Sequence, residues 1–323
     1  MVIYLVRATE PSIVDHVFAA IHAAVDRATL TRLAHALIKR DGLKTLQLDF
    51  SMPDQPLGVE VALRLPLSFV SILSSTGHFY AMSSISIANL TIPVDSQTPD
   101  ASALFEAFCR LLQSLPYLKS VMFANLALPT ARLRELLPKQ IESIEILDTS
   151  RNANVHDLTD AIAQLPKLKY LRIMAYDRSF LAHILSTPRN INDAAITKLP
   201  TLQTLCLDSV GCDTEGWLLS VLSYLENPIE FPKLHTLAIS CCIRGISDEF
   251  PTQRLARAIG DKVAFPAVRC VQLPSSTYWH EPSQFHWTHA LQKALIKDNI
   301  DLKLDENENL EFRKFQSASQ EQE

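Results

Sequence analysis

An apolar residue followed at the third and fifth positions by two more apolar residues recurs along most of this chain. The alternation of apolar and polar residues over the second half of each copy predicts a short strand with one buried face. The eight copies begin at Leu43, Met82, Leu118, Ile141, Leu168, Leu202, Leu234 and Val268. A weaker ninth copy, formed by Ile300, Leu302 and Leu304, predicts one more strand.

Five of these copies share a lead-in, in which an apolar residue and then a proline precede the first apolar position of the repeat. A proline lacks a backbone N–H, which suits the residue just before a strand joins a ladder. The lead-ins are Leu115-Pro116, Leu165-Pro166, Leu199-Pro200, Phe231-Pro232 and Phe265-Pro266.

Between the strands, apolar residues recur at three-to-four spacing, which predicts helices. One run follows Asp100 and consists of Leu104, Phe105, Phe108, Leu111, Leu112 and Leu115. Another follows Asp213 and consists of Leu218, Val221, Leu222 and Leu225. One strand and one helix cannot cover the strand's apolar face, so neighbouring units must stack. The sequence therefore predicts an α/β solenoid whose parallel strands, at least eight, follow chain order with right-handed crossovers.

The repeated Leu-x-x-Leu-x-Leu segments, the proline lead-ins and the intervening helices resemble the leucine-rich-repeat superfamily, in particular its ribonuclease-inhibitor-like and fungal F-box-type members. The resemblance covers roughly residues 40–305 and implies a horseshoe with strands on the concave face and helices on the convex face. It also implies substrate recognition for a cullin-type ubiquitin ligase. The sequence departs from the family in three respects. Repeat length varies, Cys242 alone matches the family's Asn or Cys ladder position, and residues 1–40 contain no Leu-Pro-x-Glu-like box.

The two ends of the chain differ from the repeats. Residues 10–41 predict one or two helices with apolar residues on a common side, so we assign residues 1–41 to an N-terminal helical cap and 42–304 to the solenoid. Residues 305–323 are acidic and then rich in Ser, Gln and Glu, which predicts a disordered tail. Between the first two repeats, a short alternation predicts an additional strand at Val59, Val61, Leu63 and Leu65.

Composition narrows the class of partner. Hydrophobic residues make up 47% of the chain and the net charge is −5, so we expect a globular protein without the basic stripe that nucleic-acid binding requires. No apolar run approaches the ~18 residues of a membrane span, so we expect no membrane partner. The six cysteines are mostly isolated, which favours a reducing compartment, the cytoplasm or the nucleus.

Candidate catalytic or cofactor motifs are weak. Gly211 and Gly216 have the spacing of a phosphate-binding loop, but Trp217 and Leu218 stand where Lys and Ser or Thr are needed. A cluster of potential zinc ligands, whose spacing matches no established signature, consists of His280, Glu281, His286 and His289. The cysteines of three consecutive repeats are interpreted as small apolar residues. We therefore expect no metal and no cofactor.

The concave face should carry the residues between the apolar strand positions, and most of these are small and neutral. Glu145, Tyr170 and Arg172 are exceptions, with Glu145 expected to pair with Arg172. Aromatic residues and arginine are the usual anchors of interfaces, so these three and an aromatic group in the last repeat are predicted to contact a protein partner. That group consists of Tyr278, Trp279 and Trp287.

The concave face offers no base beside a nucleophile, so the predicted function is a non-catalytic protein-binding scaffold. The alternatives are a GTPase-activating protein or a metal-dependent enzyme built on the same kind of repeat.

Overall fold

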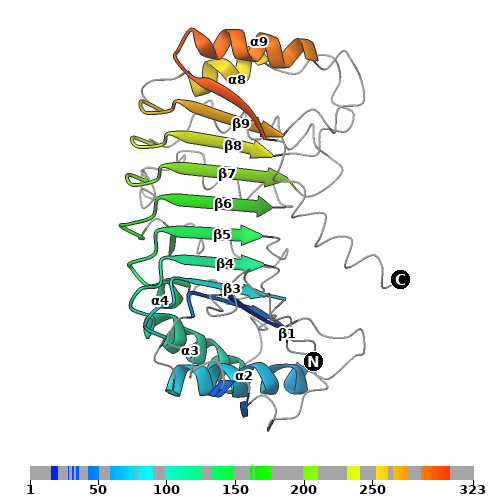
Figure 1. The fold of residues 1–323 in the computed structure, drawn as a ribbon, viewed down its shortest axis with the longest axis vertical. Coiled ribbons are helices and arrows are strands. Elements are labelled where there is room, and N and C mark those ends of the chain that lie inside the picture. The colour runs from blue at the N-terminus through cyan, green and yellow to red at the C-terminus, as the bar shows by residue number, and fades with distance from the viewer. Residues whose placement is uncertain are drawn as a thin grey trace, which may run out of the picture. The chain divides into compact units, whose positions relative to one another are not determined.

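The structure is a computed structural model whose chain divides into two compact units, Met1–Lys169 and Tyr170–Glu323. Each unit is built on parallel strands, and its described helices gather near one end of the row of strands (Figure 1). The residues that the structure describes are 16–20, 28, 31–32, 34–35, 43–50, 59–76, 79–89, 99–124, 133–147, 161–162, 164–175, 199–209, 231–240, 252–260, 265–274 and 285–305.

Among its described residues, the first unit contains five strands, and neighbours along the chain pair in parallel. They are β1 (His16–Ala20), β2 (Thr45–Asp49), β3 (Ser84–Ala88), β4 (Ser120–Ala124) and β5 (Ser143–Leu147). The register aligns the second apolar position of each repeat with that of its neighbour, as Leu46 aligns with Ile85 and Ile85 with Val121. The α/β class and the parallel order are therefore as predicted.

The second unit repeats this arrangement with five further parallel strands in chain order. They are β6 (Tyr170–Ala175), β7 (Thr204–Ser209), β8 (Thr236–Ser240), β9 (Cys270–Pro274) and β10 (Asp301–Asp305). All eight strong copies of the repeat form strands, and the weak ninth copy forms β10. The strand predictions for the repeats are confirmed.

The apolar repeat positions form the core of each unit. Leu46, Ile85 and Val121 of the first unit, and Leu171 and Leu205 of the second, are all 0% exposed. Because successive copies are aligned in register, their side chains stack into continuous buried rows. Burying a side chain of this size removes it from water with a gain of roughly 1.5–3 kcal/mol.

The proline lead-ins form tight turns at the starts of the strands. The N–H of Leu118 donates to the carbonyl of Leu115 at 3.3 Å, and the N–H of Leu168 donates to that of Leu165 at 3.4 Å. In each turn the proline is the second residue, where its fixed φ suits the backbone. The apolar residue before it is buried, and two such residues, Phe231 and Phe265, stack with ring centroids 5.5 Å apart.

The described helices of the first unit lie toward the β1–β3 end of its row of strands. They are α2 (Val59–Thr76), α3 (Pro99–Gln113) and the short α4 (Leu133–Leu136). The predicted apolar run of α3 is buried throughout, and Phe108 meets Phe50 edge to face with ring centroids 6.1 Å apart. Asp100 lies within the first turn of α3 rather than before it, where its charge still favours the positive end of the helix.

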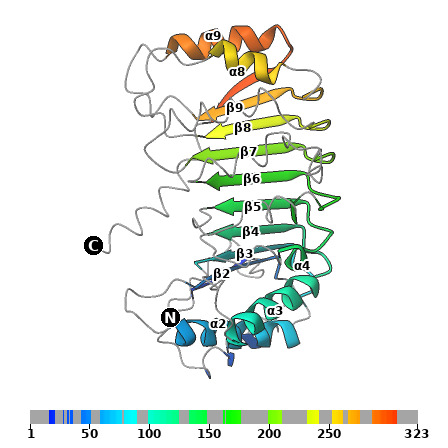
Figure 2. The same cartoon turned by 180° about the vertical axis from the view of Figure 1, so that it is seen from behind.

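Two sequence predictions in the first unit are wrong. Residues Val59 to Leu65 begin helix α2 instead of forming a strand, because alternation over so few positions does not exclude a helix. Phe69, Val70 and Leu73 follow at helical spacing and are 0% exposed, and α2 packs alongside α3 (Figure 2).

The second wrong prediction is the helix over residues 16–20. These residues form β1, which pairs in parallel with β2 and so shares its backbone hydrogen bonds. Residues 28, 31–32 and 34–35 are helical. The boundaries 1–41, 42–304 and 305–323 stay predictions.

The second unit has helices α8 (Thr252–Ile259) and α9 (Phe285–Ile296), which pack against each other. Helix α9 ends in a Schellman motif that leads into β10. Asn299 has a φ of 57°, its N–H donates to the carbonyl of Ile296, and the N–H of Ile300 donates to that of Leu295. Asn tolerates this left-handed conformation better than most residues, so the strand begins at a defined position. The helix predicted after Asp213 lies outside the described residues.

The buried rows of the second unit give the first testable prediction. Leu171→Ala and Leu205→Ala should each lower the free energy of unfolding by ~2–5 kcal/mol, because truncation leaves a cavity in a packed core. Chemical denaturation with urea measures the loss. Ile296→Ala, which truncates a side chain that is 58% exposed, is the control and should cost less than ~0.5 kcal/mol. Equal losses at all three positions would contradict the assigned register.

Candidate functional site

Strand positions that alternate with the buried apolar rows form a second surface on each sheet, which we call the polar face. In the first unit most of these side chains are half-buried, among them Gln47, Met122 and Glu145. Ser86 is the exception. It is 6% exposed, and its Oγ has no hydrogen-bond partner within the described residues. The polar face of this unit is therefore rich in small hydroxyl and amide groups and carries the carboxylate of Glu145.

The polar face of the second unit contains a short ion pair. Arg172 lies on β6, two residues after Tyr170, and its Nε donates to Oδ2 of Asp208 on β7 at 2.6 Å. The register places Cys206 opposite Arg172 and Asp208 opposite Met174, so the pair runs diagonally between adjacent strands. Arg172 and Asp208 are 21% and 6% exposed in their side chains, so the pair is largely removed from water.

Burial has the largest effect on the pKa of Asp208. Loss of hydration raises the pKa of the Asp208 carboxyl above its ordinary value of 3.8, and the neighbouring Arg172 guanidinium offsets this only in part. A raised carboxyl pKa is a common property of catalytic acids. Here, however, the carboxylate is covered and already engaged by a cation, whereas a general acid or base must reach its substrate. The pair instead holds the Arg172 side chain in place.

The sequence-predicted site residues fall into three groups. Tyr170 and Arg172 share the polar face of β6, as the alternation predicts, and both are half-buried. Glu145 lies on the polar face of β5 in the other unit, so its pairing with Arg172 stays a prediction. Trp287 belongs to helix α9 by its backbone, while Tyr278 and Trp279 lie outside the described residues.

Sequence reasoning missed Asp208, which pairs with Arg172 in this structure. The signal was present, because the alternation that places Thr204 and Cys206 on the polar face places Asp208 there as well. Counting one more alternating position at the end of each strand would have found it. The carboxylate was overlooked because it follows the last apolar residue of the repeat.

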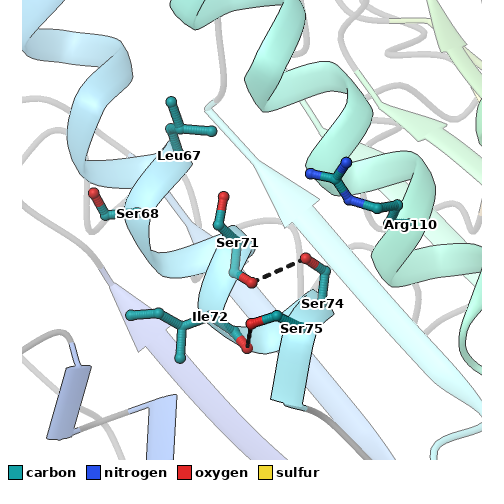
Figure 3. A pocket seen from close by; sticks show the side chains of 7 residues that line it. All are labelled: Leu67, Ser68, Ser71, Ile72, Ser74, Ser75 and Arg110. Carbon is teal, nitrogen blue, oxygen red and sulfur yellow. Dashed lines mark hydrogen bonds between the residues drawn. The ribbon is translucent and has the colours of Figure 1, made fainter.

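A groove of about 560 Å³ lies on the helical side of the first unit. Figure 3 shows Arg110 of α3 facing the serine-bearing side of α2. Two hydroxyls bond within their own helix, since Ser74 Oγ donates to the carbonyl of Ser71 at 3.0 Å and Ser75 Oγ to that of Ile72 at 3.2 Å. The groove thus combines one cation with small hydroxyl side chains and offers no acid–base pair among the residues that line it.

The candidate metal ligands are only partly placed. His286 and His289 are three residues apart on α9, and His280 and Glu281 lie outside the described residues. Within the described part of the chain, no group of three His, Cys, Asp or Glu side chains would hold a metal ion. Cys206 is buried and Cys270 half-buried, and both are free thiols. No helix in the described residues is long and apolar enough to cross a membrane.

Comparison with known proteins adds little to this geometry. No protein-family model matches the chain, and no curated protein is significantly similar to it. Among solved structures, the chain is similar to PH0766 from Pyrococcus horikoshii OT3, with 10% sequence identity and a TM-score of 0.26. The match covers 91% of this chain and 81% of that one. A TM-score this low supports no inference about fold or function.

The raised pKa of Asp208 gives the second testable prediction. The folded state keeps the Asp208 proton to a higher pH than the unfolded chain does, so ionisation favours unfolding as the pH rises above 3.8. The wild type should therefore lose stability relative to Asp208→Asn as the pH increases through this window. Urea unfolding of both proteins at a series of pH values measures the difference.

Glu142→Gln is the control with the opposite sign. Hydrogen bonds from Lys169 and then Lys119 lower the pKa of Glu142 below 4.5, so the wild type should gain stability relative to this variant as the pH rises. If the Asp208 comparison also showed a gain, the attraction of Arg172 would outweigh the burial of the carboxylate.

Proposed function

We propose that this chain is a non-catalytic protein-binding scaffold of the leucine-rich-repeat kind. The observation that carries the proposal is the placement of Tyr170 and Arg172 two residues apart on the polar face of one strand, with Arg172 fixed by Asp208 at 2.6 Å. Tyr and Arg are the side chains that most often contribute strongly to protein interfaces.

An arginine side chain that is already held in place loses less conformational entropy when a partner binds it. A free arginine side chain loses roughly 0.5–1.5 kcal/mol of conformational entropy when an interface immobilises it. Arg172 already bonds through Nε, so most of this loss occurs on folding rather than on binding. The planar guanidinium is therefore held in one orientation before a partner binds.

The repeated strand-and-turn architecture of each unit supports the leucine-rich-repeat part of the proposal, and with it the concave placement of the strands. Within this proposal, the chain would select substrates for a cullin-type ubiquitin ligase in the cytoplasm or the nucleus. This finer assignment rests on the resemblance of the repeats and lead-ins to F-box-type proteins.

The third testable prediction concerns the partner. A protein captured from a cell lysate on the wild-type chain, identified by mass spectrometry and then purified, should bind Tyr170→Ala and Arg172→Ala at least about tenfold more weakly. Isothermal titration calorimetry measures the affinities. Thermal melts establish that each variant is folded.

Tyr80→Ala is the matched control, because it removes the same side chain from a position that is 62% exposed in the first unit. Its affinity should stay within about twofold of the wild type. If both Tyr170→Ala and Arg172→Ala bind the partner with unchanged affinity, the polar face of β6 is excluded as the binding site.

A further inference from the structure

The starts of the strands in the first unit form a continuous edge that is held together by backbone hydrogen bonds. The carbonyl of Lys44 accepts the N–H of Ser83 at 2.9 Å, and that of Ser83 accepts the N–H of Lys119 at 2.8 Å. The carbonyl of Lys119 accepts the N–H of Glu142, and that of Glu142 accepts the N–H of Lys169, both at 2.8 Å. These five residues therefore occupy consecutive rungs of one ladder.

Three of the five rungs carry a lysine and one carries Glu142. Glu142 accepts contacts from Lys169 at 2.7 Å and from Lys119 at 3.2 Å, so one carboxylate is shared by two cations. Lys139 and Lys167, each directly after the proline of its turn, add two exposed cations that have no ion-pair partner within the described residues. We call this set the basic edge, which consists of Lys44, Lys119, Lys139, Lys167 and Lys169 together with Glu142.

The lysines are brought together only by stacking. They come from four repeats, with Lys167 and Lys169 in the same one, and the chain as a whole has a net charge of −5. The corresponding ladder of the second unit is mixed in charge, with Gln203, His235, Arg269 and Asp301 on its rungs. A row of lysines is thus not a general consequence of the repeat but a property of the first unit.

The dimensions of the basic edge fit an extended peptide. Four strand spacings of about 4.8 Å separate Lys44 from Lys169, which gives a length of about 19 Å. At about 3.3 Å per residue, an extended peptide of about six residues spans this distance. Tyr117, which is 62% exposed in the turn before Lys119, adds an aromatic surface beside the lysines.

Nucleic acid fits the same edge less well. Proteins bind nucleic-acid backbones by neutralising several phosphates at once with lysine and arginine. The basic edge has five lysines, and Glu142 interrupts them with a negative charge. A side-chain carboxylate can instead bond to a single lysine and leave its neighbour on Glu142.

We propose that the basic edge binds an acidic segment of a partner protein, about six residues long and in extended conformation. This inference rests on the proposed scaffold function and deepens it by naming the chemistry of one partner. The carboxylates of the segment would contact the exposed lysines, mainly Lys139 and Lys167, and would compete with Glu142 for Lys119 and Lys169.

The fourth testable prediction uses a fluorescein-labelled peptide of six consecutive glutamates, with a six-glutamine peptide as its neutral counterpart. Fluorescence anisotropy of the full chain should detect the glutamate peptide but not the glutamine peptide, and binding should weaken as ionic strength rises past ~0.1 M. The triple variant Lys119→Gln, Lys139→Gln and Lys167→Gln should bind about tenfold more weakly.

A matched control removes the same three charges elsewhere. Lys233, Lys293 and Lys297 are exposed in the second unit, and Lys233 occupies the same position after a proline as Lys167 does. Changing all three to glutamine should leave the affinity within about twofold. Glu142→Gln should tighten binding severalfold, because it removes the competing carboxylate, and a gain of this kind cannot arise from misfolding.

Three outcomes would overturn the inference: no binding of the glutamate peptide by the wild type, an equal loss in the control variant, or tighter binding of an oligothymidylate of the same charge. The last would assign the edge to nucleic acid. Loss of partner binding in Tyr170→Ala is measured separately. If that loss occurs while the peptide fails to bind, the scaffold proposal stands and the basic edge alone is excluded.

Discussion

Each repeat strand in this chain is five or six residues long, and its apolar side chains are covered by those of the strands beside it. Leu205, for example, is aligned with Leu171 on one side and Leu237 on the other, and all three are 0% exposed. A strand this short cannot bury its own apolar face or satisfy its own backbone groups. The repeat must therefore recur in register, and a shift by one residue would move every leucine to the opposite face.

That requirement explains why the functional candidates lie where they do. The apolar positions of the repeat must stay apolar to fill the buried rows. Charged and polar side chains can therefore stand only on the polar face and in the turns at the strand starts. Arg172 and Asp208 use the polar face, where adjacent strands bring two charges from residues far apart in the chain to 2.6 Å. Lys139 and Lys167 of the basic edge lie in the turns, each exposed directly after a proline. Its other lysines lie at the strand starts, on the ladder of backbone hydrogen bonds.

The repeat made most of this fold predictable, because its apolar positions and lead-ins determine the order and register of the repeat strands. Prediction failed where the alternation of apolar residues covered few positions or where a segment did not match the repeat. The alternation at Val59 to Leu65 covers too few residues to distinguish a strand from a helix, and the β1 segment does not match the repeat. Of the candidate site, Tyr170 and Arg172 followed from alternation, whereas Asp208 required counting one position further. The basic edge was hidden because net charge averages over residues that only the fold brings together.

The polar face around Arg172 and the basic edge differ in how far their charges are exposed to water. This difference decides how binding at each surface would depend on salt. The side chain of Asp208 is 6% exposed, so little solvent or salt reaches the Arg172–Asp208 pair. Forming the pair requires dehydration of the carboxylate, which raises the pKa of Asp208. The lysines around Glu142 are exposed to water, where charges more than about 10 Å apart are largely screened at 0.1 M salt. A contact centred on Tyr170 should therefore depend on shape and dehydration and change little with ionic strength. A contact along the basic edge should depend mainly on charge, forming quickly through attraction at long range and dissociating readily as salt increases.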